Sequence, residues 1–385
     1  MSTSLIRDFT DAEARQRLVL KWGIVPDDVL PAWVAEMDFA VHEPIRTAVG
    51  DAVAGSALGY PVFGATAGAA LGTAYARFAA RHYGHQLDPS WVLPVVDVTA
   101  GVRLAVDVLS EPGPVITPTP CYPPMLEIGA VTGKGRVDVP IDPDSDRAAL
   151  DLVGIERELA AGARTVILIN PHNPWGRAFT RPELEALRDL VTGFGARVVA
   201  DEIHAPLVLP GAEHIPYLSL PGTADHAVAV VAASKAFNTA GLRCAQVVVG
   251  DDATRDRLAS AEMSRNDSWS PLGVIAARVA YAEGDEWLAA LIERLAAQRD
   301  LYTALLAEHL PAARTRPLEA TFLSWLDLRG YGHDDPATIA LERGRVQVSP
   351  GHDFEPGLSG HVRVNLATSP ERLTEIVRRL ASALS

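Results

Sequence analysis

Short apolar runs that each end in polar residues constrain the fold of this chain more than any other feature. Three such runs occupy residues 165–169, 197–200 and 227–231 and are rich in valine, isoleucine and alanine. Their length and composition predict buried β-strands, and the helical patterns between them predict a mainly parallel sheet. Open sheets of this kind bind ligands at the carboxyl ends of their strands. The polar residues that follow the runs are therefore candidate site residues.

The same alternation extends along the rest of the chain. Strands are expected at 92–98, 114–117, 137–140 and 246–249, and helices at 101–109, 124–131 and 151–160. One long helical stretch is expected at 271–307, then strands at 321–326, 346–349 and 361–366 and a helix from residue 370. We predict an α/β fold, in which a large domain with a mainly parallel sheet is covered by helices on both faces and a smaller α+β domain follows.

The predicted division has three parts. Residues 1–45 form an N-terminal segment that joins the small domain, residues 46–280 form the large domain, and residues 281–385 form a linking helix and the small domain. A chain of 385 residues is long enough for more than one such unit.

Composition excludes several classes of protein. A hydrophobic content of 48% and a charged content of 21% are typical of a globular chain and argue against disorder. A formal net charge of −14 argues against nucleic acid or an anionic membrane as partner. The first residues lack the apolar core of a signal peptide, no apolar run reaches membrane-spanning length, and the two cysteines make no disulfide framework. We expect a cytoplasmic protein.

Three polar motifs follow the three apolar runs. Asn173 lies in the segment 170–176, Asp201 opens the tetrad Asp-Glu-Ile-His, and Lys235 follows Ser234 in the segment 233–243. They are spaced 28 and 34 residues apart (201 − 173 and 235 − 201). A lysine at the end of a strand, with Arg243 eight positions further on, suits a Schiff base to an aldehyde cofactor and a cation for its phosphate. The alternative for the lysine alone is a surface residue beside a loop.

The order of these motifs resembles the fold-type I pyridoxal-phosphate enzymes, the aspartate aminotransferase superfamily of class I and II. The resemblance runs from Trp33 to Arg363, nearly the whole chain. Within the superfamily the chain is most similar to the MalY/PatB-type cystathionine β-lyases, or C–S lyases. The subgroup cues are the segment 30–39, the Asp-Glu-Ile-His tetrad and the segment 234–242.

The resemblance implies a pyridoxal 5'-phosphate cofactor and three catalytic residues. Lys235 binds the cofactor aldehyde and later carries the proton of the substrate Cα. Asp201 keeps the pyridine nitrogen protonated by a charge-assisted hydrogen bond, and a helix cap is its alternative. Tyr122 stacks on one face of the ring, and a generic buried tyrosine is its alternative.

Further cofactor contacts are implied in the same way. Asn173 donates to the phenolic oxygen, or is simply a turn former, and Ile203 packs against the second ring face on the same side of the strand as Asp201. His204 reaches the phenolic oxygen or is a structural histidine. The phosphate is expected to be bound by four residues, namely the amides of Gly101 and Val102 at the start of a helix, Arg243, and Tyr60 from the neighbouring subunit of a homodimer.

Substrate binding is expected from Arg363, Asn173, Trp33 and Ala35. Arg363 matches the arginine that holds the substrate carboxylate, although its place between Val362 and Val364 also fits a solvent-facing strand residue. The side-chain pocket is expected to be lined by Trp33, Phe63, Trp269 and Phe322. No metal is expected.

One position departs from the pattern of the family. Many relatives carry serine or threonine three residues before the lysine, where this chain has Ala232, so Ser234 is the candidate that replaces this phosphate ligand. Cys121 and Cys244 flank expected cofactor residues, and either could line the pocket or be a small buried residue.

The expected activity is carbon–sulfur β-elimination on cystathionine or a related S-substituted cysteine. Two alternatives stay open, an aminotransferase acting with a 2-oxo acid and a catalytically inactive regulatory or binding protein on the same fold. The catalytic residues do not distinguish the lyase from the aminotransferase, because both reactions use the same residues.

Overall fold

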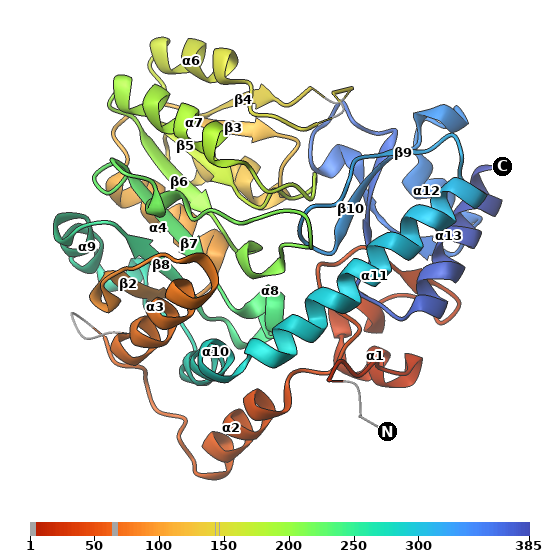
Figure 1. Cartoon of the computed structure of the whole chain (residues 1–385), viewed down its shortest axis with the longest axis horizontal. Coiled ribbons are helices and arrows are strands. Elements are labelled where there is room, and N and C mark those ends of the chain that lie inside the picture. Colours follow the sequence, from red (N-terminus) through yellow and green to blue (C-terminus); the bar gives the residue numbers. More distant parts are fainter. Residues whose placement is uncertain (1–4, 64–67, 143, 146) are drawn as a thin grey trace.

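The computed structural model describes residues 5–63, 68–142, 144–145 and 147–385. Its largest element is a seven-stranded sheet in the spatial order β2-β8-β7-β6-β5-β3-β4 (Figure 1). The strands are β2 (Val92–Val95), β3 (Val115–Thr119), β4 (Arg136–Pro140), β5 (Thr165–Ile169), β6 (Arg197–Asp201), β7 (Ala227–Val231) and β8 (Ala245–Val249). Within this sheet β8 runs opposite to the six other strands, so the predicted mainly parallel sheet is confirmed.

Helices cover both faces of this sheet because its central strands are apolar on both sides. Alternate residues of a strand point to opposite faces. In β5, Val166 and Leu168 pack in the larger core cluster, while Ile167 and Ile169 pack in a second cluster with α4 (Val98–Leu109). The remaining helices of this part are α2 (Glu43–Ala54), α3 (Ala69–Tyr83), α5 (Ile128–Val131), α6 (Leu152–Ala160), α7 (Arg181–Gly193), α8 (Ser234–Phe237), α9 (Asp252–Ala259) and α10 (Pro271–Glu283).

A smaller antiparallel sheet lies beside the large one, in the order β12-β13-β10-β9 (Figure 1). Its strands are β9 (Arg314–Thr315), β10 (Leu323–Asp327), β12 (Ser349–Pro350) and β13 (His361–Asn365). The helices of this part are α11 (Asp285–His309), α12 (Pro336–Glu342) and α13 (Pro370–Leu384). In Figure 1, α11 runs from the neighbourhood of α10 and α8 to the side of α13.

The N-terminal part of the chain packs with the smaller sheet region. It contains α1 (Asp11–Arg17), the π-helical turn η1 (Val19–Gly23) and β1 (Leu30–Pro31), and β1 pairs in parallel with β11 (Val346–Gln347). Arg372 of α13 also donates to the Phe9 carbonyl at 2.6 Å. The boundaries 1–45, 46–280 and 281–385 stay a prediction.

Several expected elements differ in detail. The single helix expected at 271–307 is two helices, divided at Gly284. A Cβ atom at Gly284 would lie 2.4 Å from the Ala280 carbonyl oxygen and 2.4 Å from the Phe237 ring, so only glycine lets the ring approach this closely. The strand expected at 346–349 is divided between β11 and β12, which pair with different strands.

The segment expected as a helix at 124–131 starts with a 3₁₀ turn at Pro123–Glu127 before α5. Among the helices of the described residues, none is both long enough and apolar enough to cross a membrane.

Candidate active site

A cavity of about 440 Å³ opens where the carboxyl ends of β5, β6 and β7 meet the smaller sheet. The sequence-predicted site residues that line it are Trp33, Ala35, Tyr122, Asn173, Asp201, Ile203, His204, Ser234, Lys235, Arg243 and Arg363. The fold therefore brings these predicted site residues together at one cavity, although some are more than three hundred positions apart in sequence.

Lys235 lies in the first turn of α8, directly after β7. Its Nζ donates to the carbonyl oxygen of Ala35 at 2.8 Å, so the amine is held at the wall of the cavity. Burial, and after it the positive charge of Arg363, lowers the pKa of Lys235 to about 8. The amine is therefore partly neutral at mildly alkaline pH, the form that attacks an aldehyde or accepts a proton.

Asp201 ends β6 and has only 3% of its surface exposed. Its Oδ1 accepts a hydrogen bond from the Ile203 amide at 3.1 Å. Burial raises the pKa of Asp201 to about 7, against the opposing effects of this hydrogen bond and of Lys235. A buried carboxylate of this kind is stabilised by any cationic N–H group that enters the cavity.

Arg363 lies in the middle of β13 and has 6% of its surface exposed, so the solvent-facing alternative is wrong. Its guanidinium donates to Asn173 Oδ1 at 3.1 Å, to the Trp33 carbonyl at 2.8 Å and to Ser349 Oγ at 3.2 Å. Its Nε is buried and has no hydrogen-bond partner among the described residues. Burial lowers the pKa of Arg363 to about 10, which leaves it a cation at neutral pH.

His204 and Tyr122 face the same cavity. Burial, together with the charges of Lys235 and Arg363, lowers the pKa of His204 to about 3, so the imidazole is neutral. The His204 Nδ1 atom is buried and also lacks a hydrogen-bond partner in the described part of the chain. Burial raises the pKa of the Tyr122 hydroxyl, which therefore stays protonated.

The phosphate end differs from the expectation. Helix α4 begins at Val98, three residues earlier than expected, because the Asp97 side chain accepts from the Ala100 amide at 2.7 Å and caps the helix. Gly101 and Val102 are thus inside the helix, and the Gly101 amide is already bonded to the Asp97 carbonyl at 2.9 Å. The prediction that their amides open the helix is wrong.

At this end of the cavity, sequence reasoning missed Val98 and Thr99. They occupy the first turn of α4, where amides have no intrahelical partner, and they line the cavity. The sequence contained a signal for this helix start, since aspartate is a preferred residue at the N-terminal cap of a helix and Asp97 directly precedes Val98. Gly101 serves packing instead, because a Cβ atom there would lie 2.6 Å from Val230 Cγ1 in the sheet.

Arg243 lies at the same end of the cavity, with its side chain 57% exposed. Its guanidinium forms an ion pair with Asp97 Oδ2 at 2.6 Å. Ala232 and Ser234 both line the cavity, and the role of Ser234 as a phosphate ligand stays a prediction.

One wall of the cavity is the segment of residues 33–39, which follows β1. The Asn365 side-chain amide donates to the carbonyls of Val34 at 2.6 Å and Glu36 at 2.7 Å. The Asn238 side chain accepts from the Met37 amide at 3.0 Å and donates to the Met37 carbonyl at 2.8 Å. Strand β13 and the residue that ends helix α8 therefore hold the 33–39 segment through its backbone.

Other expected pocket residues lie elsewhere. Phe63 and Trp269 contact each other with ring centroids 5.2 Å apart, and neither lines the cavity. Phe322 is buried, with its ring centroid 6.3 Å from that of His204. Of the four residues expected in the side-chain pocket, only Trp33 is found there, whereas Leu20, Glu36 and Ser349 were missed.

Cys244 lines the cavity, whereas Cys121 is fully buried outside its lining. Tyr60 is 96% exposed in the segment after α2 and does not line the cavity of its own chain. Its contact with a second subunit stays a prediction.

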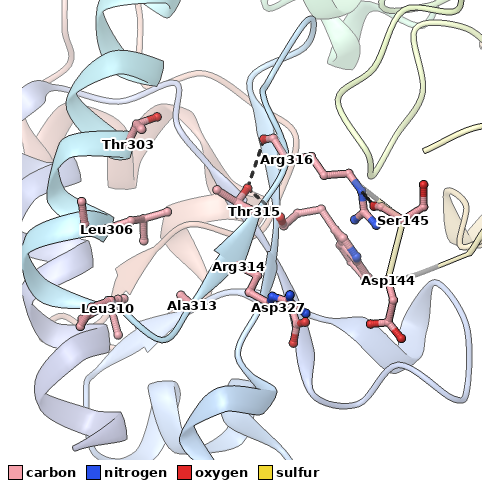
Figure 2. Close-up of a pocket in the computed structure, with 13 residues that line it drawn as sticks. Asp144, Ser145, Thr303, Leu306, Leu310, Ala313, Arg314, Thr315, Arg316 and Asp327 are labelled. Atoms are coloured by element: carbon pink, nitrogen blue, oxygen red, sulfur yellow. Dashed lines mark hydrogen bonds between the residues drawn. The ribbon is translucent and has the colours of Figure 1, made fainter. Parts of the chain in front are cut away.

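A second cavity, of about 410 Å³, lies between the end of α11, strand β9 and residues 144–145 (Figure 2). None of the sequence-predicted site residues lines it. Three of its charged side chains are paired within the chain. Asp144 and Asp327 form ion pairs with Arg329 at 2.6 Å and 2.8 Å, and Arg316 donates to the Ser145 carbonyl at 2.7 Å. These contacts join the two sheet regions, so the first cavity is the candidate active site.

Known proteins match this chain over nearly its full length. The model of the aminotransferase class I and II family matches residues 23–380. A cystathionine β-lyase of Corynebacterium glutamicum is 37% identical over 374 residues, covering 97% of this chain and 98% of the relative. The cystathionine β-lyase PatB of Bacillus subtilis is 32% identical and covers 93% of each chain.

Among solved structures, a Corynebacterium diphtheriae protein provisionally named a pyridoxal-phosphate-dependent β-cystathionase superposes with a TM-score of 0.93. It is 33% identical, and the match covers 98% of this chain and 99% of that one.

Proposed function

This chain belongs to the class I and II aminotransferase family of pyridoxal-phosphate-dependent enzymes, and from that premise we propose that it is a carbon–sulfur β-lyase. Its substrate is cystathionine or a related S-substituted cysteine, and its products are a thiol, pyruvate and ammonia. The observation that carries the proposal is the convergence of Lys235, Asp201 and Arg363 on one cavity, in a chain whose full-length relatives include cystathionine β-lyases.

The residues of the cavity fit pyridoxal phosphate. Three residues that line it are Arg363, His204 and Asp201. Arg363 Nε and His204 Nδ1 are buried polar atoms without a hydrogen-bond partner among the described residues, and the carboxyl of Asp201 is also buried. Asp201 would hold the pyridine nitrogen and Asn173 the phenolic oxygen. When bound, the cofactor supplies an aldehyde that captures the substrate amine and a ring that withdraws electrons from Cα.

The phosphate would be held at the start of α4. The Val98 and Thr99 amides and the helix dipole provide an anion site, and Arg243 provides a cation. Tyr122 and Ile203 would flank the ring. This assignment replaces the Gly101 and Val102 amides of the original expectation.

Lys235 would move the proton that starts the elimination. With a pKa lowered to about 8, its amine accepts the Cα proton at mildly alkaline pH. The Cβ–S bond then breaks and its electron pair leaves with the sulfur, after which the remaining fragment hydrolyses to pyruvate and ammonia. The Ala35 carbonyl, 2.8 Å from Nζ, keeps the amine at the cavity wall.

Arg363 would hold the substrate carboxylate. Its buried guanidinium keeps a positive charge at neutral pH, and the contacts with Asn173 and Trp33 fix its plane. A fixed guanidinium binds a carboxylate through two parallel hydrogen bonds, which orients Cα toward Lys235.

The test is product analysis with the purified holoenzyme and L-cystathionine. A β-lyase releases pyruvate and a thiol in equal amounts without an added 2-oxo acid. Lys235→Ala should abolish this release while the protein stays folded. Amino transfer to an added 2-oxo acid without release of pyruvate or thiol would show an aminotransferase and contradict the proposal. The proposal would also be contradicted if the purified protein had no cofactor absorbance band that borohydride bleaches.

A further inference from the structure

Trp175 is a large buried side chain that the proposed mechanism does not use. It lies two residues after Asn173 in the segment that follows β5, and 2% of its surface is exposed. The side chain of Arg316, which follows β9, lies over its ring, with the guanidinium carbon 3.8 Å from the ring centroid. The ring centroid of Trp325 in β10 is 6.1 Å from that of Trp175, with the planes inclined at 65°. A residue of the large sheet region is therefore packed against residues of the smaller sheet.

Arg316 is itself held against the large sheet region. Its guanidinium donates to the Ser145 carbonyl at 2.7 Å (Figure 2). It also donates to the Asp142 carbonyl at 3.4 Å, in the same segment between β4 and α6. A guanidinium over an indole face is attracted by the ring electrons, so Arg316 and Trp175 hold each other in place.

The smaller sheet links Trp325 to Arg363. The two residues lie directly opposite each other in the pairing of β10 with β13, so their side chains are on the same face. Phe354 contacts both, since its ring centroid lies 5.2 Å from that of Trp325 and 4.8 Å from the guanidinium carbon of Arg363. Trp175 is thus connected to Arg363 by an unbroken series of buried contacts.

Two neighbouring contacts join the same two parts of the molecule. Asn173 Oδ1 accepts from Arg363 at 3.1 Å, and Trp175 packs on Trp325. The hydrogen bond is directional and weakens when its geometry changes, whereas the indole is a rigid, closely packed spacer. A smaller side chain at position 175 would let the smaller sheet shift toward the space left behind, and the guanidinium of Arg363 would move with it.

We propose that Trp175 is a positioning residue that sets the separation of the two sheets at which Arg363 binds the substrate carboxylate. The inference rests on the role of Arg363 in the proposed function. A displacement of about 1 Å in a group that orients a substrate can remove much of its effect. The packing of Trp175 therefore determines how well Arg363 binds a carboxylate, although Trp175 does not line the cavity.

The other role open to Trp175 is that of a core residue that only stabilises the fold. The two roles differ in one measurable respect. A loss of stability alone leaves the binding preference of the folded enzyme unchanged, whereas a displaced Arg363 weakens the binding of ligands that carry a carboxylate.

The experiment measures the binding of L-norvaline and butylamine to the holoenzyme by calorimetric titration. Butylamine is L-norvaline without its carboxylate, and neither has a leaving group at Cβ, so the ratio of their dissociation constants gives the preference for the carboxylate. Trp175→Leu should lower this preference by about 10-fold or more, with the affinity for butylamine unchanged. The cofactor absorbance should also be unchanged.

Trp175→Phe is the conservative variant. It keeps an aromatic ring but fills less space, so it should lower the preference by a smaller factor, about 2- to 5-fold. An unchanged preference in both folded variants would overturn the role of Trp175. If Trp175→Leu does not fold, the result for Trp175→Phe decides.

Phe78→Leu is the matched control for lost core packing. Phe78 of α3 is 1% exposed, and its ring packs on that of Tyr281 in α10, with the centroids 5.1 Å apart. This variant should lower the free energy of unfolding and leave the preference for L-norvaline at the wild-type value.

A double variant shows whether Trp175 acts through Arg363. In an Arg363→Gln background the preference no longer depends on the guanidinium, so Trp175→Leu should change it by less than about 2-fold. An effect of the same size in both backgrounds would overturn the role of Trp175.

Failure of the proposed function would give a different result. A wild-type holoenzyme that releases no pyruvate from L-cystathionine would overturn the lyase function, while the binding preference still decides the role of Trp175. A wild-type enzyme without any preference for L-norvaline would overturn the carboxylate role of Arg363 and this inference with it.

Discussion

At the scale of single residues, burial gives the site its chemical character. The pKa of Lys235 is lowered to about 8 and that of Asp201 is raised to about 7, in both cases chiefly because a charged form is costly away from water. His204 is held neutral for the same reason. The cavity therefore contains groups whose charged forms would be stabilised by a ligand of complementary charge.

Asp201 gives a prediction about stability and pH. Its folded-state pKa of about 7 lies above the ordinary value of 3.8, so its stabilising contribution is present below pH 4 and is lost as pH rises through 7. Cofactor-free Asp201→Asn should be more stable than the cofactor-free wild type at pH 8, by about 1–4 kcal/mol, and the gap should shrink at pH 5. Chemical denaturation of both proteins at the two pH values measures this.

The exposed Asp189 supplies a control for Asp201, since its side chain is 70% exposed and Asp189→Asn should show no such gap. With pyridoxal phosphate added, the order should reverse, because the variant lacks the anionic partner of the ring nitrogen. Equal stabilities at pH 8 would show that the cavity does not penalise the ionised carboxylate.

Arg363 is predicted to act on the substrate and not on the cofactor. Arg363→Lys keeps a cation but loses the two-pronged geometry, so KM should rise by about 10-fold or more while the cofactor spectrum is unchanged. Steady-state kinetics and absorbance of the same preparation check this. Loss of the cofactor from the variant would place Arg363 at a different part of the site.

At the scale of elements, the 33–39 segment shows how the wall of the site is built without regular secondary structure. Its carbonyls accept from Arg363 and Asn365 of β13 and from Lys235 of α8, and its amide and carbonyl at Met37 bind Asn238. Helix α4 contributes differently, through the free amides at its start. Irregular and regular elements thus both supply backbone groups to the cavity.

Asn238 provides the test of the 33–39 segment. It adopts a left-handed conformation, with φ of 56°, and makes hydrogen bonds to the Met37 amide and to the Met37 and Phe39 carbonyls. Asn238→Gly removes these bonds without backbone strain and should cost about 1–3 kcal/mol of unfolding free energy. Asn238→Ala adds the left-handed penalty and should cost about 1 kcal/mol more.

The same Asn238 variants should reduce kcat, because the Ala35 carbonyl that positions Lys235 lies two residues from Met37. Urea denaturation and pyruvate release measured on both variants check the two effects. Full activity in Asn238→Gly would show that the 33–39 segment does not determine the position of Lys235.

At the scale of the whole molecule, the cavity is closed by parts that are distant in the chain. The large sheet contributes Asp201, helix α8 contributes Lys235, the smaller sheet contributes Arg363, and the N-terminal part contributes residues 33–36. The segment after α2 carries Leu58, Tyr60 and Val62, which are 62%, 96% and 64% exposed. Exposed apolar groups so close together in the chain are typical of an interface between subunits.

We predict a homodimer in which Tyr60 reaches the phosphate site of the partner. Tyr60→Phe should weaken cofactor binding by about 1 kcal/mol, the value of one hydrogen bond. Light scattering gives the oligomeric state, and cofactor titration over a dilution series gives the affinity. Tyr331 lies outside this segment and is partly buried, and its hydroxyl accepts from the Ala312 amide at 3.3 Å. Tyr331→Phe, which also removes one hydrogen bond, is therefore the control and should leave cofactor affinity unchanged. A stable monomer with full cofactor affinity would contradict the shared site.

Local pattern was enough to predict the main elements and most of the site. The central residues of strands β5, β6 and β7 are apolar because both faces of the sheet are covered, and this property is readable from the sequence alone. Parallel strands bring their carboxyl ends together, so the sequence alone predicts that Asn173, Asp201 and Lys235 lie close to one another.

Tertiary structure decided what depends on distant contacts. The Phe237 ring of α8 requires glycine at the division between α10 and α11, because a Cβ atom at Gly284 would lie 2.4 Å from this ring. The position of Glu36 in the cavity depends on Lys21 and Asn365, which hold its carbonyl from opposite ends of the chain. The periodicity of the sequence indicates which face of an element is apolar. Which distant side chain contacts that face is decided only when the chain packs, so the sequence determined the elements and their apolar faces, and the tertiary structure determined their contacts.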